Sequence, residues 1–220
     1  MIQEGDRIAV GVSGGKDSLT LLVMLRRLMD FYPVKYELKA VTISMGIGEP
    51  DFSPVARLCE EIGIEYIIED TYIGKIVFED KQEDNPCSLC ANLRRGALNN
   101  TAVRLGCNKV ALAHNRDDVI ETLLLSTFYE GRIHSFSPVT YLDRKGITVI
   151  RPLLYVEEKK IKVFVRDQHF QIVHNPCPAN GHTKRQFIKE LLIDLTADNR
   201  EIKNNIFGAI KRSGLDGWHE

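Results

Sequence analysis

A chain of 220 residues, 44% of them hydrophobic, is long enough for one substantial packed domain and too short for a second large one. Its 29 basic and 30 acidic residues give a formal net charge of -1, which excludes an overall basic field, so nucleic acid would have to be held by local patches. The N-terminus lacks an export signal and no apolar run approaches the length that spans a bilayer, so we expect a cytoplasmic protein with no membrane partner. In such a protein five cysteines, an odd number, indicate metal or redox chemistry rather than a disulfide framework.

Strand-like and helix-like segments alternate along most of the chain. Apolar, β-branched runs predict strands at residues 7–12, 38–43, 66–68, 109–113 and 148–151. Amphipathic patterns predict helices at 19–29, 55–62, 88–105, 118–129 and 157–168, then charged helices at 185–195 and 200–211. This alternation predicts an α/β fold, a doubly wound, mostly parallel, Rossmann-like sheet with C-terminal helices. We expect residues 1–180 to form the main domain and residues 181–220 a helical extension.

A glycine-rich turn follows the first predicted strand, and a helix begins directly after it. The turn consists of Ser13, Gly14, Gly15, Lys16, Asp17 and Ser18. Glycines let successive backbone N–H groups turn toward one anion, and the helix N-terminus favours negative charge. The serines add hydroxyl groups and Lys16 a positive charge, so we predict a phosphate site in which Lys16 and Asp17 are catalytic. Because Asp17 would repel a bare phosphate, we expect it to hold a Mg²⁺ ion there.

The spacing of this turn differs from that of a Walker A loop. Three residues instead of four separate Gly11 from Gly15, and Asp17 follows the lysine. The run Ser-Gly-Gly-Lys-Asp-Ser resembles the PP-loop signature of the N-type ATP pyrophosphatases. That resemblance implies an adenine nucleotide alpha hydrolase-like fold and cleavage of ATP between its α and β phosphates, which activates a carbonyl oxygen as an adenylate. The motif implies the type of reaction and leaves the substrate open.

Three of the cysteines are candidate ligands of a metal centre. Cys87 and Cys90 stand at the start of a predicted helix, spaced so that both thiols can point at one metal or cluster, and Cys177 lies in a proline-stiffened loop. Three thiolates on a 4Fe-4S cluster would leave one iron open to an exogenous sulfur species, and the helix N-terminus would favour the negative charge. Cys59 and Cys107 lie in or beside apolar helical faces and are predicted to be core residues.

Two other interpretations of the cysteines stay open. A structural zinc site would recruit His174 or His182 as its fourth ligand, because three cysteines and one histidine form a closed tetrahedral set. A redox pair of Cys87 and Cys90 is the second, and it leaves Cys177 unexplained.

A polar cluster follows the predicted strand at 109–113. His114, Asp117 and Asp118 lie just past the carboxyl end of that strand, where doubly wound sheets bind ligands. We predict that His114 contacts ATP and that one carboxylate holds Mg²⁺ or orients the base, which makes both aspartates candidate catalytic residues. In the alternative, Asn115 or Asp117 caps the next helix and His114 is satisfied in a loop.

Three more polar residues are assigned to the site. Arg94, one turn beyond Cys90, shares its helix face and is predicted to reach a phosphate or sulfur intermediate beside the cluster, as a catalytic residue. Arg151 ends a strand and is predicted to bind the triphosphate bidentately. Ser44, at the end of another strand, is predicted to contact ATP.

The phosphate turn and the cysteines together narrow the resemblance. The motifs are Cys-Ser-Leu-Cys at 87–90 with Leu-Arg-Arg-Gly at 93–96, Ala-His-Asn-Arg-Asp-Asp at 113–118 with Glu-Thr-Leu at 121–123, and Ile-Arg-Pro-Leu at 150–153. In this order, from Glu4 to about Gln186, they resemble the tRNA 2-thiocytidine synthetase (TtcA) family. The resemblance implies that residues 1–180 are a PP-loop ATP pyrophosphatase domain and that the three cysteines carry a 4Fe-4S cluster. It also implies 2-thiocytidine as the product, at position 32 of the tRNA anticodon loop.

The same resemblance implies partners. We expect tRNA to be held by Arg94, Arg95, Lys184 and Arg185. A cysteine desulfurase or free sulfide would donate the sulfur, and a homodimer stays open. ATP would adenylate the O2 atom of cytidine, pyrophosphate would leave, and sulfur would attack C2 and expel AMP. The alternatives are a PP-loop ligase or amidase with a zinc site, a tRNA 2-thiouridine synthetase, and a nucleotide-binding or iron-sulfur sensor without enzymatic activity.

Overall fold

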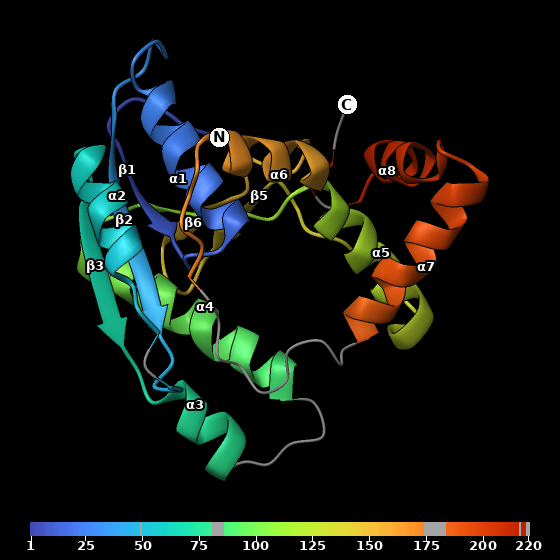
Figure 1. Ribbon diagram of the computed structural model, residues 1–220, viewed down its shortest axis with the longest axis horizontal. Helices are drawn as coiled ribbons and strands as arrows, with labels where there is room; N and C mark the ends of the chain where they lie inside the picture. Colours follow the sequence, from blue (N-terminus) through green and yellow to red (C-terminus); the bar gives the residue numbers. More distant parts are fainter. Residues whose placement is uncertain (49, 81–85, 174–183, 216, 219–220) are drawn as a thin grey trace.

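A computed structural model describes residues 1–48, 50–80, 86–173, 184–215, 217 and 218. Its centre is a six-stranded sheet with the strand order β3-β2-β1-β4-β6-β5 (Figure 1). The strands are β1 (Asp6–Gly11), β2 (Tyr36–Ser44), β3 (Glu65–Asp70), β4 (Lys109–Ala111), β5 (Val139–Leu142) and β6 (Ile147–Ile150).

The sheet reverses its direction of growth between β1 and β4. From β1 the chain adds β2 and β3 on one side, then returns to place β4 and β6 on the other, all of them parallel. The pairs Ile8↔Lys109 and Val10↔Ala111 set the register of the two central strands. Ligands of doubly wound sheets bind at such a reversal, beyond the carboxyl ends of the strands. The predicted fold class is therefore confirmed, and the expected position of a site is defined.

One strand was not predicted from the sequence. β5 pairs antiparallel with β6, with Val139 opposite Ile150, and forms an edge of the sheet. Its side chains are exposed or half-buried, including Val139 and Tyr141. A short edge strand lacks the continuous apolar run that marks the buried parallel strands, so its sequence gives a weak signal.

Helices cover the two faces of the sheet unequally. α1 (Lys16–Leu28), α2 (Ser53–Glu61) and α6 (Glu158–Asp167) lie over one face, and α4 (Pro86–Arg104) lies over the other (Figure 1). After β3, the short helix α3 (Ile73–Lys75) continues into a π-helical turn at Ile76–Asp80, neither of which was predicted.

Alternation along β1 explains the two cores. Ile8 and Val10 are fully buried against α1, α2 and α6, while Ala9, between them, faces the core beneath α4. A strand buried on both faces has to be apolar throughout, and the sequence of β1 is apolar from Ile8 to Val10. Cys59 and Cys107 are buried in these two cores, which confirms their predicted structural role.

A third core joins the C-terminal helices to the sheet domain. α7 (Lys184–Asp198) and α8 (Ile202–Arg212) pack against α5 (Arg116–Glu130) through Ile120, Ile188, Leu192 and Ile210, which are all buried. Trp218 closes this core, and its indole N–H donates to the carbonyl oxygen of Phe136. The helices α7 and α8 are therefore fixed on α5, which follows β4 in the chain, on the side of the molecule opposite β3 (Figure 1). Within the described parts of the chain, no helix is both long enough and apolar enough to cross a membrane.

Candidate active site

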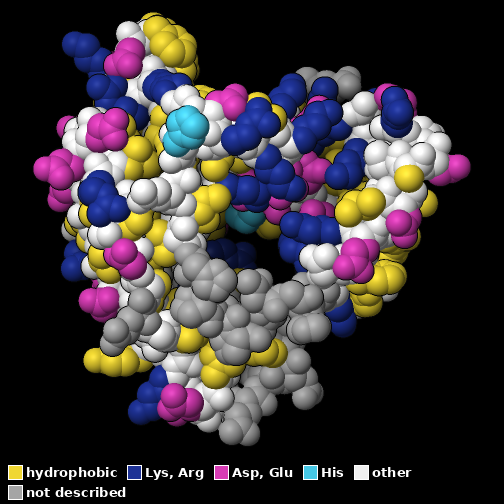
Figure 2. Space-filling model, in the orientation of Figure 1, with side chains coloured by type: hydrophobic (Ala, Val, Ile, Leu, Met, Phe, Trp, Pro, Cys, Tyr) yellow, Lys and Arg dark blue, Asp and Glu magenta, His cyan; other side chains and the backbone are white. Residues whose placement is uncertain are grey.

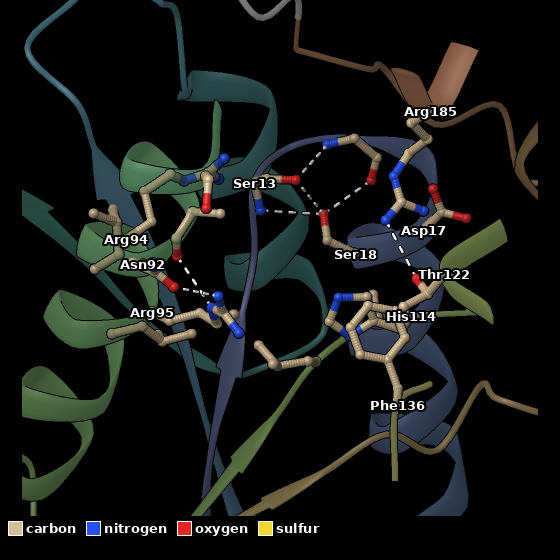
Figure 3. Close-up of a pocket in the computed structure, with 18 of the residues that line it drawn as sticks. Ser13, Asp17, Ser18, Asn92, Arg94, Arg95, His114, Thr122, Phe136 and Arg185 are labelled. Atoms are coloured by element: carbon tan, nitrogen blue, oxygen red, sulfur yellow. Dashed lines mark hydrogen bonds between the residues drawn. The ribbon is translucent and has the colours of Figure 1, made fainter. Parts of the chain in front are cut away.

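A cavity of about 780 Å³ opens at the carboxyl ends of β1 and β4. The strand ends at Gly11 and Leu112 line it. Residues of α4, such as Arg94 and Arg95, lie on one side, and Thr122 of α5 and Phe136 of the segment after it lie on the other (Figure 3). Its volume lies in the upper part of the range for small-molecule sites, so it has room for more than one small ligand. The described residues that matter most to its chemistry are Ser13, Gly15, Asp17, Ser18, Ser88, Arg94, Arg95, His114, Phe136 and Arg185.

The glycine-rich turn forms one edge of this cavity. Gly14 has a positive φ of +79°, and Gly15 is the N-cap of α1. The Ser18 hydroxyl donates to the carbonyl oxygen of Gly15 over 2.9 Å and accepts from the backbone N–H of Ser13 over 3.1 Å, which fixes the turn. The helix N-terminus behind it carries partial positive charge and unpaired N–H groups. The turn therefore has the structure that a phosphate-binding loop requires.

Lys16 and Asp17 belong to one network of ionic contacts. The ammonium of Lys16 lies 2.7 Å from Asp17 Oδ2 and 2.9 Å from Glu158 Oε1, and Asp17 Oδ1 accepts from the Asn115 side chain over 3.0 Å. Burial disfavours the charged form of Lys16, but its bonds to the two carboxylates outweigh this and raise its pKa. Asp17 lines the cavity, whereas Lys16 is held beside it. Glu158, at the start of α6, was not predicted to reach this network, because it stands in no recognisable motif.

The N-terminus of α5 is closed by a capping box. Asn115 accepts from the backbone N–H groups of Asp117 and Asp118, and the Asp118 carboxylate accepts from the N–H of Asn115 over 2.9 Å. Burial raises the pKa of Asp118, against the effect of its hydrogen bond and of Arg185. The capping alternative considered from the sequence therefore describes Asn115 correctly.

Asp117 and Asp118 do not form one pair of carboxylates facing the cavity. Asp117 Oδ2 accepts from the backbone N–H of Glu158 over 2.8 Å, and Oδ1 binds the ammonium of Lys203 over 2.7 Å. Neither aspartate lines the cavity. In this structure Asp117 joins α5 to α6 and α8, which differs from the catalytic position expected from the sequence.

His114 forms part of the cavity wall on an aromatic support. Its ring stacks on Phe136 with a centroid distance of 4.1 Å, and its Nδ1 is buried with no hydrogen-bond partner among the described residues. Burial, followed by the charges of Arg151, Arg185 and Arg95, lowers the pKa of His114 to about 3. The imidazole is therefore neutral at physiological pH. Phe136 carries no sequence motif and was not predicted.

Arg151 and Ser44 lie outside the cavity wall. Arg151 is buried behind Phe136, with its guanidinium 5.4 Å from the ring centroid and Nη1 donating to the carbonyl oxygen of Ser137 over 2.6 Å. Burial lowers its pKa to about 10. The carbonyl oxygen of Ser44 is taken by Thr71. Neither residue lines the cavity, so the ATP contacts predicted for them from the sequence stay predictions.

The first half of α4 forms the opposite wall. Arg94 and Arg95 both line the cavity, and Arg95 is held by the carbonyl oxygen of Ala91 over 3.2 Å and by Asn92 Oδ1 over 2.5 Å (Figure 3). Arg94 also lines an adjoining pocket of about 240 Å³, which shares Ser13 and Gly15 with the large cavity. Two arginines therefore face the phosphate loop across one space.

The same helix begins with two of the predicted metal ligands. Cys87 is exposed, and Cys90, one turn further, has its sulfur 3.5 Å from the sulfur of Met45. Ser88 lies between them in sequence and lines the cavity, so this end of α4 opens onto the same space as the phosphate loop. Cys177 and the possible zinc ligands His174 and His182 lie outside the described residues.

Cys87 and Cys90, at the start of α4, can supply two of the thiolate ligands of a metal centre or cluster. Thiolates are favoured at a helix N-terminus, where the backbone carries partial positive charge. Among the described residues, no group of three or more histidine, cysteine, aspartate or glutamate side chains is close enough to bind one metal ion. The third cysteine predicted for the cluster, Cys177, lies outside the described residues.

Two predicted RNA contacts fall at the start of α7. Lys184 lies over the ring of Tyr129, 4.6 Å from its centroid, on the outside of the molecule. Arg185 lines the cavity and binds Glu121 of α5 over 2.9 Å. Basic side chains gather beside the central hollow over α6 and near α5 and α7 (Figure 2). The structure thus brings Arg94, Arg95 and Arg185 to one space and leaves Lys184 on the surface.

Residues 2–196 match the PP-loop domain family. The chain is 43% identical to the tRNA-cytidine(32) 2-sulfurtransferase of Geobacter sulfurreducens, over 96% of this chain and 83% of that one. This chain belongs to the family of PP-loop tRNA-cytidine(32) 2-sulfurtransferases. A further member of the family, from Anaeromyxobacter sp. strain K, is 39% identical over 96% of this chain and 73% of its own. The family resemblance seen in the sequence is confirmed.

Solved structures agree on the fold. The U34-tRNA thiolase NcsA from Methanococcus maripaludis, solved with its 4Fe-4S cluster, superposes with a TM-score of 0.79 over 98% of this chain and 74% of that one, at 24% identity. The ammonia-dependent NAD synthetase from Campylobacter jejuni gives a TM-score of 0.52 over 93% of this chain and 79% of its own, at 20% identity. This PP-loop family therefore shares its sheet with enzymes that act on different substrates.

Proposed function

We propose that the chain is an ATP-dependent tRNA sulfurtransferase that converts a cytidine of the tRNA anticodon loop, at position 32, to 2-thiocytidine, with release of AMP and pyrophosphate. The observation that carries the proposal is the cavity itself. Ser13 and Asp17 of the phosphate loop form one edge, and Ser88, between the two cysteines of α4, belongs to the opposite wall. In this proposal, nucleotide activation and sulfur chemistry share one space. Membership of the 2-sulfurtransferase family supports this assignment.

The phosphate loop performs the activation step in this proposal. The loop backbone and the N-terminus of α1 bind the phosphates of ATP, and Asp17, at the cavity edge, is the residue that would hold a Mg²⁺ ion, which would neutralise them. Lys16, fixed beside Asp17, stabilises the charge that develops as pyrophosphate leaves. The carbonyl oxygen of cytosine then becomes part of an AMP ester, which is a far better leaving group. Arg94, across the cavity, is the residue we assign to the adenylate phosphate.

Sulfur replaces that oxygen at C2. Cys87 and Cys90, with Cys177, are the residues that would hold a 4Fe-4S cluster. When bound, a cluster with three protein ligands keeps one iron open to a sulfur species. The thiolase NcsA, which has the same fold, was solved with a 4Fe-4S cluster. The sulfur itself comes from a cysteine desulfurase or from free sulfide.

The tRNA would approach the open side of the cavity. Arg95 of α4 lines the cavity and Lys184 lies on the surface at the start of α7, and their positive charges suit RNA phosphates. The stacked pair of His114 and Phe136 offers an aromatic surface to an unstacked base. In this proposal residues 1–180 supply the PP-loop and cluster site, and residues 181–220 complete the tRNA side. We place this tRNA-modifying activity in the cytoplasm, with a homodimer compatible with it.

The decisive experiment measures two products of one reaction. Anaerobically reconstituted protein is incubated with tRNA, ATP, Mg²⁺ and sulfide, and pyrophosphate is assayed together with 2-thiocytidine by nucleoside mass spectrometry. Formation of both is expected. Formation of pyrophosphate without any thiolated nucleoside would replace the proposal with a PP-loop ligase.

Variants separate the two halves of the site. Lys16→Ala should lose pyrophosphate release and 2-thiocytidine together, whereas Cys90→Ala should retain ATP binding and lose the thiolated nucleoside. Cys59→Ser, in the core, is the matched control that removes a cysteine outside the site. Equal loss of 2-thiocytidine in the Cys59 and Cys90 variants, with folding intact, would contradict the assignment of Cys90.

A further inference from the structure

An ion pair with a buried glutamate fixes one arginine at the cavity. Glu121, on α5, is 3% exposed, and its Oε2 lies 2.9 Å from Nη1 of Arg185, the second residue of α7. The other terminal nitrogen of Arg185 donates to Thr122 Oγ1 over 3.3 Å. A second carboxylate is also near, because Asp118 Oδ1 lies 3.7 Å from Nη1 of Arg185. The direction of this guanidinium is therefore set by α5, although the residue belongs to the helix that follows the segment containing Cys177.

Packing alone does not explain a glutamate at this position. A carboxylate loses hydration on burial, and burial raises the pKa of Glu121 against the opposing effect of Lys189 and Arg185. An apolar pair of similar size would join α5 to α7 at least as well, as Ile120 and Ile188 do nearby. What the glutamate adds is a fixed positive charge beside the cavity.

The two cations that pair with Glu121 differ in position. Arg185 lines the cavity, whereas Lys189, whose ammonium lies 3.8 Å from Glu121 Oε1, does not. A guanidinium has five N–H donors, and the bonds to Glu121 and Thr122 leave others for a ligand. Figure 3 shows Arg185 on the same side of the cavity as Asp17 and the phosphate loop.

A ligand on the phosphate loop needs such a charge. Among the described residues, the cations that line the cavity are Arg94, Arg95, Arg132 and Arg185. Arg94 and Arg95 stand on the α4 wall, and Arg132 is paired with Glu130 over 2.6 Å. Lys16 is engaged by Asp17 and Glu158. Arg185 is thus the cation that the fold holds on the α5 side of the loop.

We infer that Arg185 binds the phosphate chain of the nucleotide and that Glu121 is a positioning residue that holds its guanidinium there. The ligand class is a nucleoside triphosphate and the pyrophosphate released from it. The inference rests on the proposed ATP-dependent function. It also gives α7 a role in the nucleotide site, in place of a contact to tRNA alone.

Direct binding measurements test this inference. Calorimetry with Mg-ATP and with Mg-pyrophosphate is performed on the parent protein and on Arg185→Gln, Glu121→Gln and Lys189→Met. Arg185→Gln and Glu121→Gln should each weaken both ligands about tenfold or more, because a charge-assisted hydrogen bond is lost or misdirected. Lys189→Met, which also removes a cation from Glu121, should change the affinity by less than about twofold.

Non-additivity separates positioning from stability. If Glu121 acts through Arg185, the double variant that carries Glu121→Gln and Arg185→Gln should bind Mg-ATP no more weakly than Arg185→Gln alone. Thermal unfolding of all variants is recorded, because a purely structural glutamate would lower Tm in Glu121→Gln and leave the affinity of the folded protein unchanged. Unchanged affinity in Arg185→Gln, or equal effects of Glu121→Gln and Lys189→Met on ATP affinity, overturns the inference.

Failure of the role inferred for Arg185 can be told apart from failure of the proposed sulfurtransferase function. If the parent protein forms no 2-thiocytidine but the two variants still lose ATP affinity, the substrate assignment fails and the role of Arg185 stands. If the parent thiolates tRNA and Arg185→Gln binds ATP normally, only the role of Arg185 fails.

Discussion

The backbone N–H of Val173 donates a 3.0 Å hydrogen bond to the carbonyl oxygen of Gly14, so the segment leading to Cys177 begins against the phosphate loop. The contact is close. A Cβ atom placed on Gly14 would lie 2.6 Å from the Cβ of Val173. The phosphate loop and Val173, which are far apart in the sequence, are thus in direct contact in the fold.

Gly14→Ala should damage the loop in two ways. Alanine would have to adopt the φ of +79°, at a cost of about 1–2 kcal/mol, and its methyl group would push Val173 away. We expect lower stability in urea unfolding and weaker binding of Mg-ATP by calorimetry. Gly63→Ala is the matched control, because Gly63 also has a positive φ of +67° but has open space around it. Identical ATP affinity in the two variants would show that the contact with Val173 is unimportant for the loop.

Asp117→Ala should lower stability. Its carboxylate bonds the first N–H of α6 and the ammonium of Lys203, and losing such charge-assisted bonds costs about 1.5–3 kcal/mol. The free energy of unfolding in urea measures this. A double-mutant cycle with Lys203→Met should show coupling between the two residues. If Asp117→Ala unfolds like the parent yet stops pyrophosphate release, the residue has the catalytic role that the sequence suggested.

Glu158→Gln should change the acid stability of the protein. Burial disfavours the Glu158 carboxylate, but its bonds to Lys16 and Lys162 outweigh this and lower its pKa to about 2, from the usual 4.5. A lowered pKa means that the unfolded chain takes up the proton first. The stabilisation is therefore complete above about pH 4.5 and is lost as the pH falls toward 2. The free energy of unfolding between pH 7 and pH 3 should fall less steeply in Glu158→Gln than in the parent. Parallel curves would mean that the bonds of Glu158 to Lys16 and Lys162 together add nothing to stability.

In protein without bound metal, the exposed and the buried cysteines should differ in their reactivity toward iodoacetamide. Cys87 is exposed, whereas Cys59 and Cys107 are buried in the core, where burial raises both pKa values, that of Cys59 to about 11. Brief treatment with iodoacetamide at pH 8, followed by peptide mass spectrometry, should label Cys87 and leave the two core cysteines unlabelled. Labelling in denaturant serves as the control, since all thiols should then react. Equal labelling of Cys59 and Cys87 in the native state would contradict the fold around α2.

The sequence by itself determined the features that depend on neighbouring residues. The apolar run at Ile8–Val10 defines a strand buried on both faces, the glycines and serines that follow define the phosphate loop, and Cys87 with Cys90 defines a thiol pair on one helical turn. Each of these patterns is complete within a few residues, so local backbone preference and side-chain periodicity are sufficient to predict it. The order of motifs along the chain also indicated the family correctly.

Only the tertiary structure decided which polar side chains face the cavity. Asp117 forms an ion pair with Lys203, 86 residues away in the sequence. Arg185 forms one with Glu121, 64 residues away. Arg151 is buried against the ring of Phe136. These partners are distant in sequence, and no local pattern announces them. A charged side chain in a folded protein points toward whichever partner best offsets its lost hydration, and that partner exists at the required distance only after the sheet and its helices have packed.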